Sequence, residues 1–214
     1  MSFEPTDISR VFSPAPSATQ TGGPAAPLQF VADVPGRLSY AELLARLLPK
    51  DRLNVERHVA MCDLNLGPAH TALWQRLACH MLTLCDSTAK TVGRHTMQFF
   101  VPDGRYRLQV FALHDQHNGH LLVYAYNVLE EAFAQDLLER PTAADSVTYR
   151  VRDTRDLLTI EQLDAKSTTP APYYKEMLGW NRRALRISLP TDATEIQLNA
   201  VETLCTLSKS KWPS

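Results

Sequence analysis

The sequence predicts an α+β fold, in which an antiparallel sheet is packed by an N-terminal helical region and a C-terminal helix. Two turn signals separate three runs rich in β-branched and aromatic residues between about residues 95 and 127, which is typical of a three-stranded meander. Helical periodicity precedes these runs and returns near the C-terminus. The predicted order differs from the βαβ alternation of a parallel sheet. It consists of helices, the meander, a helix, one or two further strands and a last helix.

The helical region before the meander divides into three segments. Ser39 and Glu42 form a Ser-x-x-Glu capping box, which predicts a helix ending at Pro49. A second helical run follows Lys50, and the break at Gly67-Pro68 separates it from a third. We expect the third segment to end near Gly93. Its apolar stripe, with spacings of four, four and three, consists of Leu73, Leu77, Met81 and Leu84.

The region after the meander alternates between helix and strand. Residues 129–138 read as a short amphipathic helix, and residues 147–151 alternate as a half-buried strand. Residues 157–163 fit either a strand or a short helix. Residues 185–189 predict a last strand, and Asp192 is a candidate cap for a final helix.

Composition restricts the class of protein. The chain has 214 residues, 44% hydrophobic residues and a formal net charge of −1, as expected for an ordinary globular protein. No cluster of basic residues extends beyond Arg182-Arg183, so nucleic-acid binding is not expected. No apolar run is long enough for membrane insertion, and the first residues lack the pattern of a secretory signal. The four cysteines lack Cys-x-x-Cys spacing, which predicts free thiols in a cytoplasmic protein.

The chain is expected to contain one domain preceded by a tail. Residues 13–27 consist only of Ser, Pro, Ala, Thr, Gln and Gly, a composition with too little apolar surface to fold. We therefore predict a flexible tail over residues 1–35 and a single α+β domain over residues 36–214. An alternative interpretation of the tail is the unstructured leader of an exported bacterial effector.

The meander predicts an apolar patch if both of its turns have two residues. Turns at 103–104 and 118–119 place Phe99 opposite Leu108 and Leu113 opposite Tyr124. In this register one face is apolar throughout, and the second face is apolar at one end. The residues of that second patch are Phe111, Leu113, Leu122, Tyr124 and Tyr126. A patch of this kind is covered either by a helix of the same chain or by a protein partner, a second copy or a small ligand.

Histidines cluster near the second turn, where three of the seven lie within residues 114–120. The expected register sends His114 to one face and places His117 and His120 on the other. Asp115, His117 and His120 are therefore a candidate two-His-one-carboxylate metal site. The alternative is a solvated polar hairpin tip.

Two further groups of residues are candidates for chemistry. His58 and Cys62 are one helical turn apart, so they fit a ligand pair, a nucleophile–base pair, or a core thiol beside a surface histidine. The sequence places no third residue with them. Arg182 and Arg183 follow Trp180 and are a candidate anion-binding site, with an ordinary turn as the alternative.

No Gly-x-Ser-x-Gly or His-Glu-x-x-His signature occurs in the sequence. We therefore expect a non-enzymatic protein–protein interaction or regulatory module without a cofactor. Its interface is expected on an apolar sheet face or a helical surface, with self-association into a homodimer as one form. The alternative is a small-ligand-binding or metal-dependent enzyme domain that uses the histidines of residues 114–120.

Overall fold

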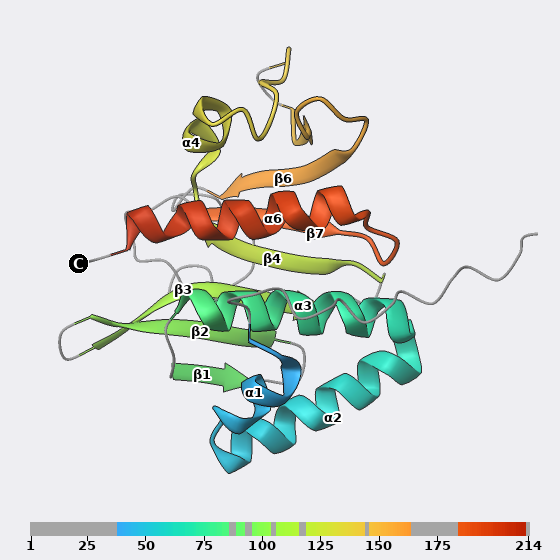
Figure 1. Ribbon diagram of the computed structural model, residues 1–214, viewed down its shortest axis with the longest axis vertical. Coiled ribbons are helices and arrows are strands. Elements are labelled where there is room, and N and C mark those ends of the chain that lie inside the picture. Colours follow the sequence, from blue (N-terminus) through green and yellow to red (C-terminus); the bar gives the residue numbers. More distant parts are fainter. Residues whose placement is uncertain are drawn as a thin grey trace, which may run out of the picture.

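The computed structural model describes residues 38–85, 89–92, 96–103, 106–115, 119–143, 146–163 and 184–212. The seven strands of these residues form one antiparallel sheet in the order β1-β2-β3-β4-β7-β6-β5, with helices before, between and after them (Figure 1). The predicted α+β class is confirmed. The predicted tail over residues 1–35 lies outside the described residues.

Local sequence signals determine the N-terminal helices. Helix α1 (Tyr40–Ala45) begins at Ser39, and both hydrogen bonds of the predicted capping box with Glu42 are present. Helices α2 (Pro49–Leu66) and α3 (Pro68–Leu84) each begin with a proline, whose missing N–H is not needed at that position. Gly67 joins the two helices with a φ of 88°, a conformation that favours glycine.

The predicted meander is confirmed as β2 (Thr96–Asp103), β3 (Tyr106–Asp115) and β4 (Leu121–Tyr126). Its predicted register is wrong in both hairpins. In the first hairpin Val101 pairs with Leu108 instead of Tyr106, and a β-bulge between Phe99 and Phe100 adds one further residue, so that Phe99 pairs with Phe111 instead of Leu108. A bulge adds one residue to one strand, and turn signals alone do not reveal it.

In the second hairpin Leu113 pairs with Val123 rather than with Tyr124, and Asp115 pairs with Leu121. A two-residue turn at 118–119 would have paired Asp115 with Leu122, so the observed register differs from the expected one by one residue. A one-residue change of register moves every side chain of the shifted strand to the opposite face relative to its partner strand. The residues that were expected to share one patch are therefore divided between two faces.

Four strands accompany the meander, where the sequence predicted one or two. They are β1 (Ala89–Val92), β5 (Thr148–Arg150), β6 (Leu157–Leu163) and β7 (Ala184–Leu189). Strand β1 occupies a segment that was expected to continue the third helix. Helix α4 (Leu129–Ala134) is shorter than expected. Helix α6 (Glu195–Ser208) is capped by Thr194 instead of Asp192, and a 3-10 turn, η1 (Lys209–Lys211), follows it.

Helices α3 and α6 lie side by side across one face of the sheet, and α2 lies beyond α3 near the β1 edge (Figure 1). The central strand β4 is buried along its whole length. Phe111 of β3 contacts Trp212, after η1, in an edge-on arrangement with ring centroids 5.4 Å apart. Alternation along β3 then places Leu113 and Asp115 on this same, helix-covered face.

Candidate functional site

The end of β3 carries a buried carboxylate that contacts two helices. Asp115 Oδ1 accepts a hydrogen bond from His70 Nε2 at 2.8 Å. Asp115 Oδ2 accepts one from the Cys62 thiol at 3.1 Å and also pairs with His58 Nε2. All four side chains are buried. We call His58, Cys62, His70 and Asp115 the buried polar cluster.

Helices α2 and α3 both contribute side chains that contact Asp115. His58 and Cys62 are four residues apart on α2, so they share one face, and the thiol sulfur lies 3.4 Å from His58 Nε2. His70 lies in the first turn of α3, directly after the change of direction at Gly67. The His58 ring also packs against Trp74 of α3, with centroids 5.1 Å apart. The joint at Gly67 thus lets both helices meet the end of one strand.

The cluster contains one carboxylate and one protonated thiol. Burial alone would raise the pKa of Asp115, but hydrogen bonds with His58 and His70 outweigh this effect and hold the pKa well below its usual range. Burial, followed by the charge of Asp115, raises the pKa of Cys62 well above that of a free thiol. Cys62 is consequently a thiol rather than a thiolate at neutral pH.

This geometry is a poor match for nucleophilic catalysis. In a Cys-His-Asp triad the imidazole contacts the nucleophile through one nitrogen and the carboxylate through the other. Here His58 Nε2 faces both Cys62 and Asp115. The raised pKa of Cys62 also removes the reactive thiolate form.

The same atoms are suitable ligands for a metal ion. One ligand atom each from His58, Cys62 and Asp115 lies within 4.8 Å of the others. An imidazole nitrogen, a sulfur and a carboxylate oxygen are the three ligand types that Zn²⁺ takes in proteins.

The structure describes two of the three metal-site residues expected from the sequence, Asp115 and His120. Asp115 is in the buried polar cluster, whereas His120 Nδ1 lies 2.8 Å from Ser188 Oγ of β7. His117 lies outside the described residues. Within the described part of the chain, the group that combines Asp115 with other ligand atoms contains His58 and Cys62 instead.

Sequence reasoning recognised part of this cluster. The spacing of His58 and Cys62 was noted, but the third residue could not be placed because Asp115 is 53 residues from Cys62. His70 was missed. No local pattern identifies it, since its role depends on the angle between α2 and α3.

The five residues of the expected sheet patch are all buried, with exposed fractions between 0 and 4%. Phe111 and Leu113 face the helices, and the register places Leu122, Tyr124 and Tyr126 on the other face. They do not form a single open surface. Arg182 and Arg183 lie outside the described residues.

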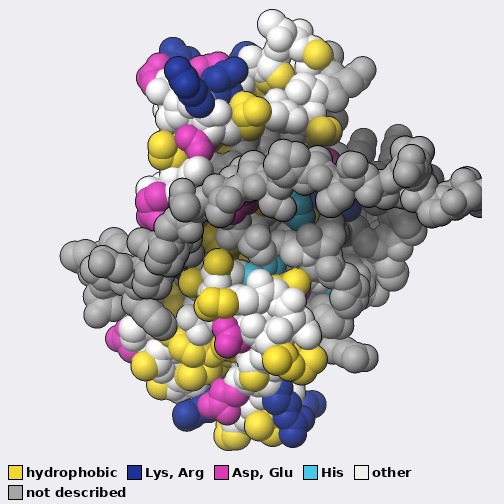
Figure 2. All heavy atoms as spheres, turned by 90° about the vertical axis from the view of Figure 1, so that its right-hand side faces the viewer, with side chains coloured by type: hydrophobic (Ala, Val, Ile, Leu, Met, Phe, Trp, Pro, Cys, Tyr) yellow, Lys and Arg dark blue, Asp and Glu magenta, His cyan; other side chains and the backbone are white. Residues whose placement is uncertain are grey.

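A different apolar surface is exposed on α2. Leu53, Met61 and Leu64 are 47, 54 and 81% exposed. Leu53 and Leu64 lie on the side of α2 opposite Cys62 and Val55, which are buried, and Met61 lies one turn from Leu64. Figure 2 shows hydrophobic side chains gathered at the lower end of the molecule, where α1 and α2 lie. We call Leu53, Arg57, Ala60, Met61 and Leu64 the outer face of α2.

The chain matches no family model, no curated protein and no solved structure. Within the described residues, none of the helices combines the length and the apolar character needed to span a bilayer.

Proposed function

We propose that the chain is a non-enzymatic protein-interaction module that assembles through the outer face of α2. The observation that carries this proposal is the exposure of three large apolar side chains on one helix. Surface helices usually turn apolar residues inward and polar residues outward. Helix α2 places His58 and Cys62 inward and exposes Leu53, Met61 and Leu64.

The spacing of the outer face suits a second helix. Leu53, Arg57, Ala60 and Leu64 follow one another at intervals of four, three and four residues, so they form a single stripe. Burying an exposed leucine is worth roughly 1.5–3 kcal/mol, which makes such a stripe a favourable contact surface.

The occupant we propose is α2 of a second copy. In an antiparallel pair related by a two-fold axis, Leu53 of one copy meets Leu64 of the other, and Arg57 meets Ala60. The first pair is apolar on both sides. In the second pair a small residue leaves room for the aliphatic part of a long one. The stripe is thus complementary to itself.

The geometry of the buried polar cluster supports a non-enzymatic function. Cys62 is held as a thiol, and His58 uses the same nitrogen toward Cys62 and Asp115, so the cluster lacks an activated nucleophile. Its visible effect is to attach α2 to the body of the protein.

Sedimentation velocity over a wide range of protein concentration tests the proposal. A stable interface buries about 800 Å² per partner. A pair of single helices is small by this standard, so we expect a monomer–dimer equilibrium that shifts on dilution. Leu64→Glu should yield monomers, because it places a charge at the end of the stripe.

The matched control is Ile196→Glu, which introduces the same charge at another exposed apolar position, on α6. This variant should dimerise like the wild type. Far-UV circular dichroism checks that both variants fold. A wild type that stays monomeric at every concentration contradicts self-association, and a dimer unaffected by Leu64→Glu contradicts the choice of surface.

A further inference from the structure

We propose that His58 Nε2, Cys62 Sγ and the carboxylate of Asp115 bind a Zn²⁺ ion between α2 and the end of β3. This inference goes beyond the proposed function and does not depend on dimerisation. Its basis is the convergence of three different ligand types in the buried polar cluster.

Two of the three separations between ligand atoms are close to those around one small ion, while His58 Nε2 and Asp115 Oδ2 lie nearer to each other and would have to move apart. Cys62 Sγ lies 3.1 Å from Asp115 Oδ2 and 3.4 Å from His58 Nε2. Tetrahedral zinc with bonds of about 2.0–2.3 Å holds its ligand atoms roughly 3.5 Å apart. Small movements of these side chains would therefore admit the ion. Three protein ligands leave one tetrahedral position for water.

Charge balance favours a divalent cation. Asp115 is a carboxylate, and Cys62 becomes a thiolate when it binds the metal, so the two ligands carry two negative charges that Zn²⁺ neutralises. Among the described residues, no lysine or arginine pairs with Asp115. Hydrogen bonds with His58, His70 and Cys62 already favour the carboxylate form of Asp115, which is the form that binds a metal ion.

His70 is a positioning residue for this site. Its Nε2 hydrogen-bonds to Asp115 Oδ1 and leaves Oδ2 directed at His58 and Cys62. His70 Nδ1 is buried and has no hydrogen-bond partner among the described residues. The tautomer that places the proton on Nε2 is therefore favoured, because it avoids a buried N–H without an acceptor. Hydrogen bonds of this kind orient carboxylate ligands in metal sites.

Binding is a proton exchange without any redox step. The S–H bond of Cys62 breaks, its proton leaves to solvent, and a Zn–S bond forms. Because binding releases the proton of the Cys62 thiol, the apparent affinity for Zn²⁺ should rise as the pH is raised.

The alternative is a hydrogen-bonded cluster that binds no metal. Titration of the reduced, metal-free full chain with Co²⁺ distinguishes the two. We expect one Co²⁺ per chain, visible d–d bands of tetrahedral cobalt, and a near-ultraviolet thiolate-to-cobalt band. Zn²⁺ should displace the cobalt and remove both signals.

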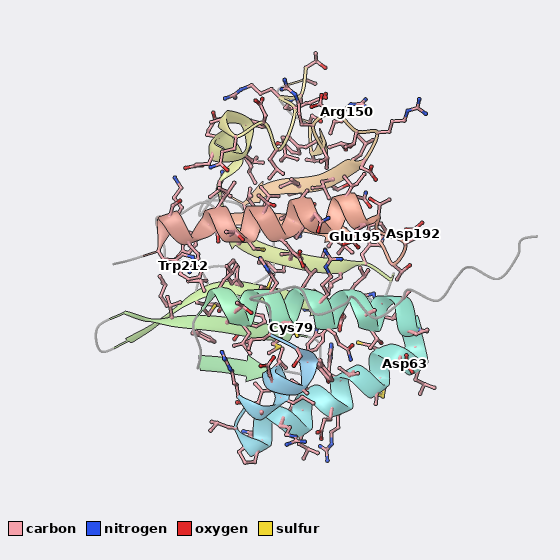
Figure 3. The ribbon with its side chains drawn as sticks, viewed as in Figure 1. Asp63, Cys79, Arg150, Asp192, Glu195 and Trp212 are labelled. Carbon is pink, nitrogen blue, oxygen red and sulfur yellow. The ribbon has the colours of Figure 1, made fainter. Side chains whose placement is uncertain are left out.

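Cys62→Ser should abolish the thiolate-to-cobalt band. The matched control is Cys79→Ser, which removes another buried thiol, located on α3 (Figure 3), and should leave the band unchanged. Asp115→Asn should weaken Co²⁺ binding at least tenfold, while His70→Gln should weaken it less, since His70 is not a ligand.

A chain that gives no cobalt spectrum, or a spectrum that survives Cys62→Ser, overturns the proposal. If Cys62→Ser does not fold, competition between the wild type and a chromophoric chelator for Zn²⁺ decides the question. Stoichiometric uptake with release of a proton supports the site, and no uptake overturns it. Dimerisation is measured separately, so the two proposals can fail independently.

Discussion

Asp115 at the end of β3 accepts a hydrogen bond from His70 of α3 at 2.8 Å, although the two residues are 45 positions apart in the sequence. The same carboxylate contacts His58 and Cys62 of α2. One side chain therefore connects both N-terminal helices to the sheet. This connection uses the inner side of α2, and Leu53 and Leu64 on the opposite side are exposed.

Asp115→Asn is expected to destabilise the chain. Hydrogen bonds to a charged group contribute about 1.5–3 kcal/mol, so we expect the free energy of unfolding to fall by roughly 2–3 kcal/mol at neutral pH. Urea denaturation measures this change. Asp63→Asn is the control, because Asp63 is exposed on α2 (Figure 3).

The effect of Asp115→Asn should also depend on pH. The pKa of Asp115 is lower in the folded chain than its ordinary value of 3.8, so its contribution is complete above that value and is lost as the pH falls below it. The difference in stability between wild type and variant should therefore shrink in acid. A difference that stays constant between neutral pH and about pH 3 contradicts the assignment.

Arg76 connects α3 to α6 through a buried ion pair. Its Nε donates to Glu202 at 2.9 Å, and its Nη2 donates to Asn199 at 2.7 Å. It also contacts the more exposed Glu195 at the start of α6 (Figure 3). We expect Arg76→Met to lower the free energy of unfolding by about 3–5 kcal/mol, because Glu202 then remains buried without its partner.

A double variant, Arg76→Met with Glu202→Leu, should recover most of that loss, since neither charge remains buried. Thermal and urea unfolding of the two single variants and the double variant complete the cycle. A loss in the double variant equal to the sum of the single losses would show that the two side chains do not interact.

Gly67→Ala should weaken the attachment of α2. No described atom lies within 4 Å of the position that an added Cβ would take, so the cost comes from the backbone conformation at a φ of 88°. We expect a loss of roughly 1–3 kcal/mol. If the joint also sets the positions of His58 and His70, Co²⁺ affinity should decrease. Unchanged stability would show that the chain accommodates alanine here.

Local signals were sufficient to predict much of the fold. The capping box of Ser39 and Glu42 and the break at Gly67-Pro68 depend on neighbouring residues, and both are present in the structure. The seven-stranded extent of the sheet was not predicted, because β1 was expected to be helical and the segment of β6 fitted either a strand or a short helix. A strand of four residues such as β1 carries little periodicity.

The candidate site was less accessible to sequence reasoning. A one-residue error in register assigned Leu113 and Tyr124 to one face, whereas the structure places them on opposite faces. The His58–Cys62 spacing is a helical pattern and could be recognised. The contact of His58 and Cys62 with Asp115 depends on how α2 packs near the end of β3, and no local pattern specifies this packing.

Cross-linking between two single-cysteine variants tests the antiparallel pairing of α2 most directly. Leu53→Cys and Leu64→Cys are oxidised separately and as a mixture, with the wild type as the background for its four buried thiols. In the proposed pair, identical positions are about 16 Å apart along the helix, too far for a disulfide. We predict a disulfide-linked dimer in the mixture alone. A mixture that cross-links no more than the separate variants and the wild type contradicts the account.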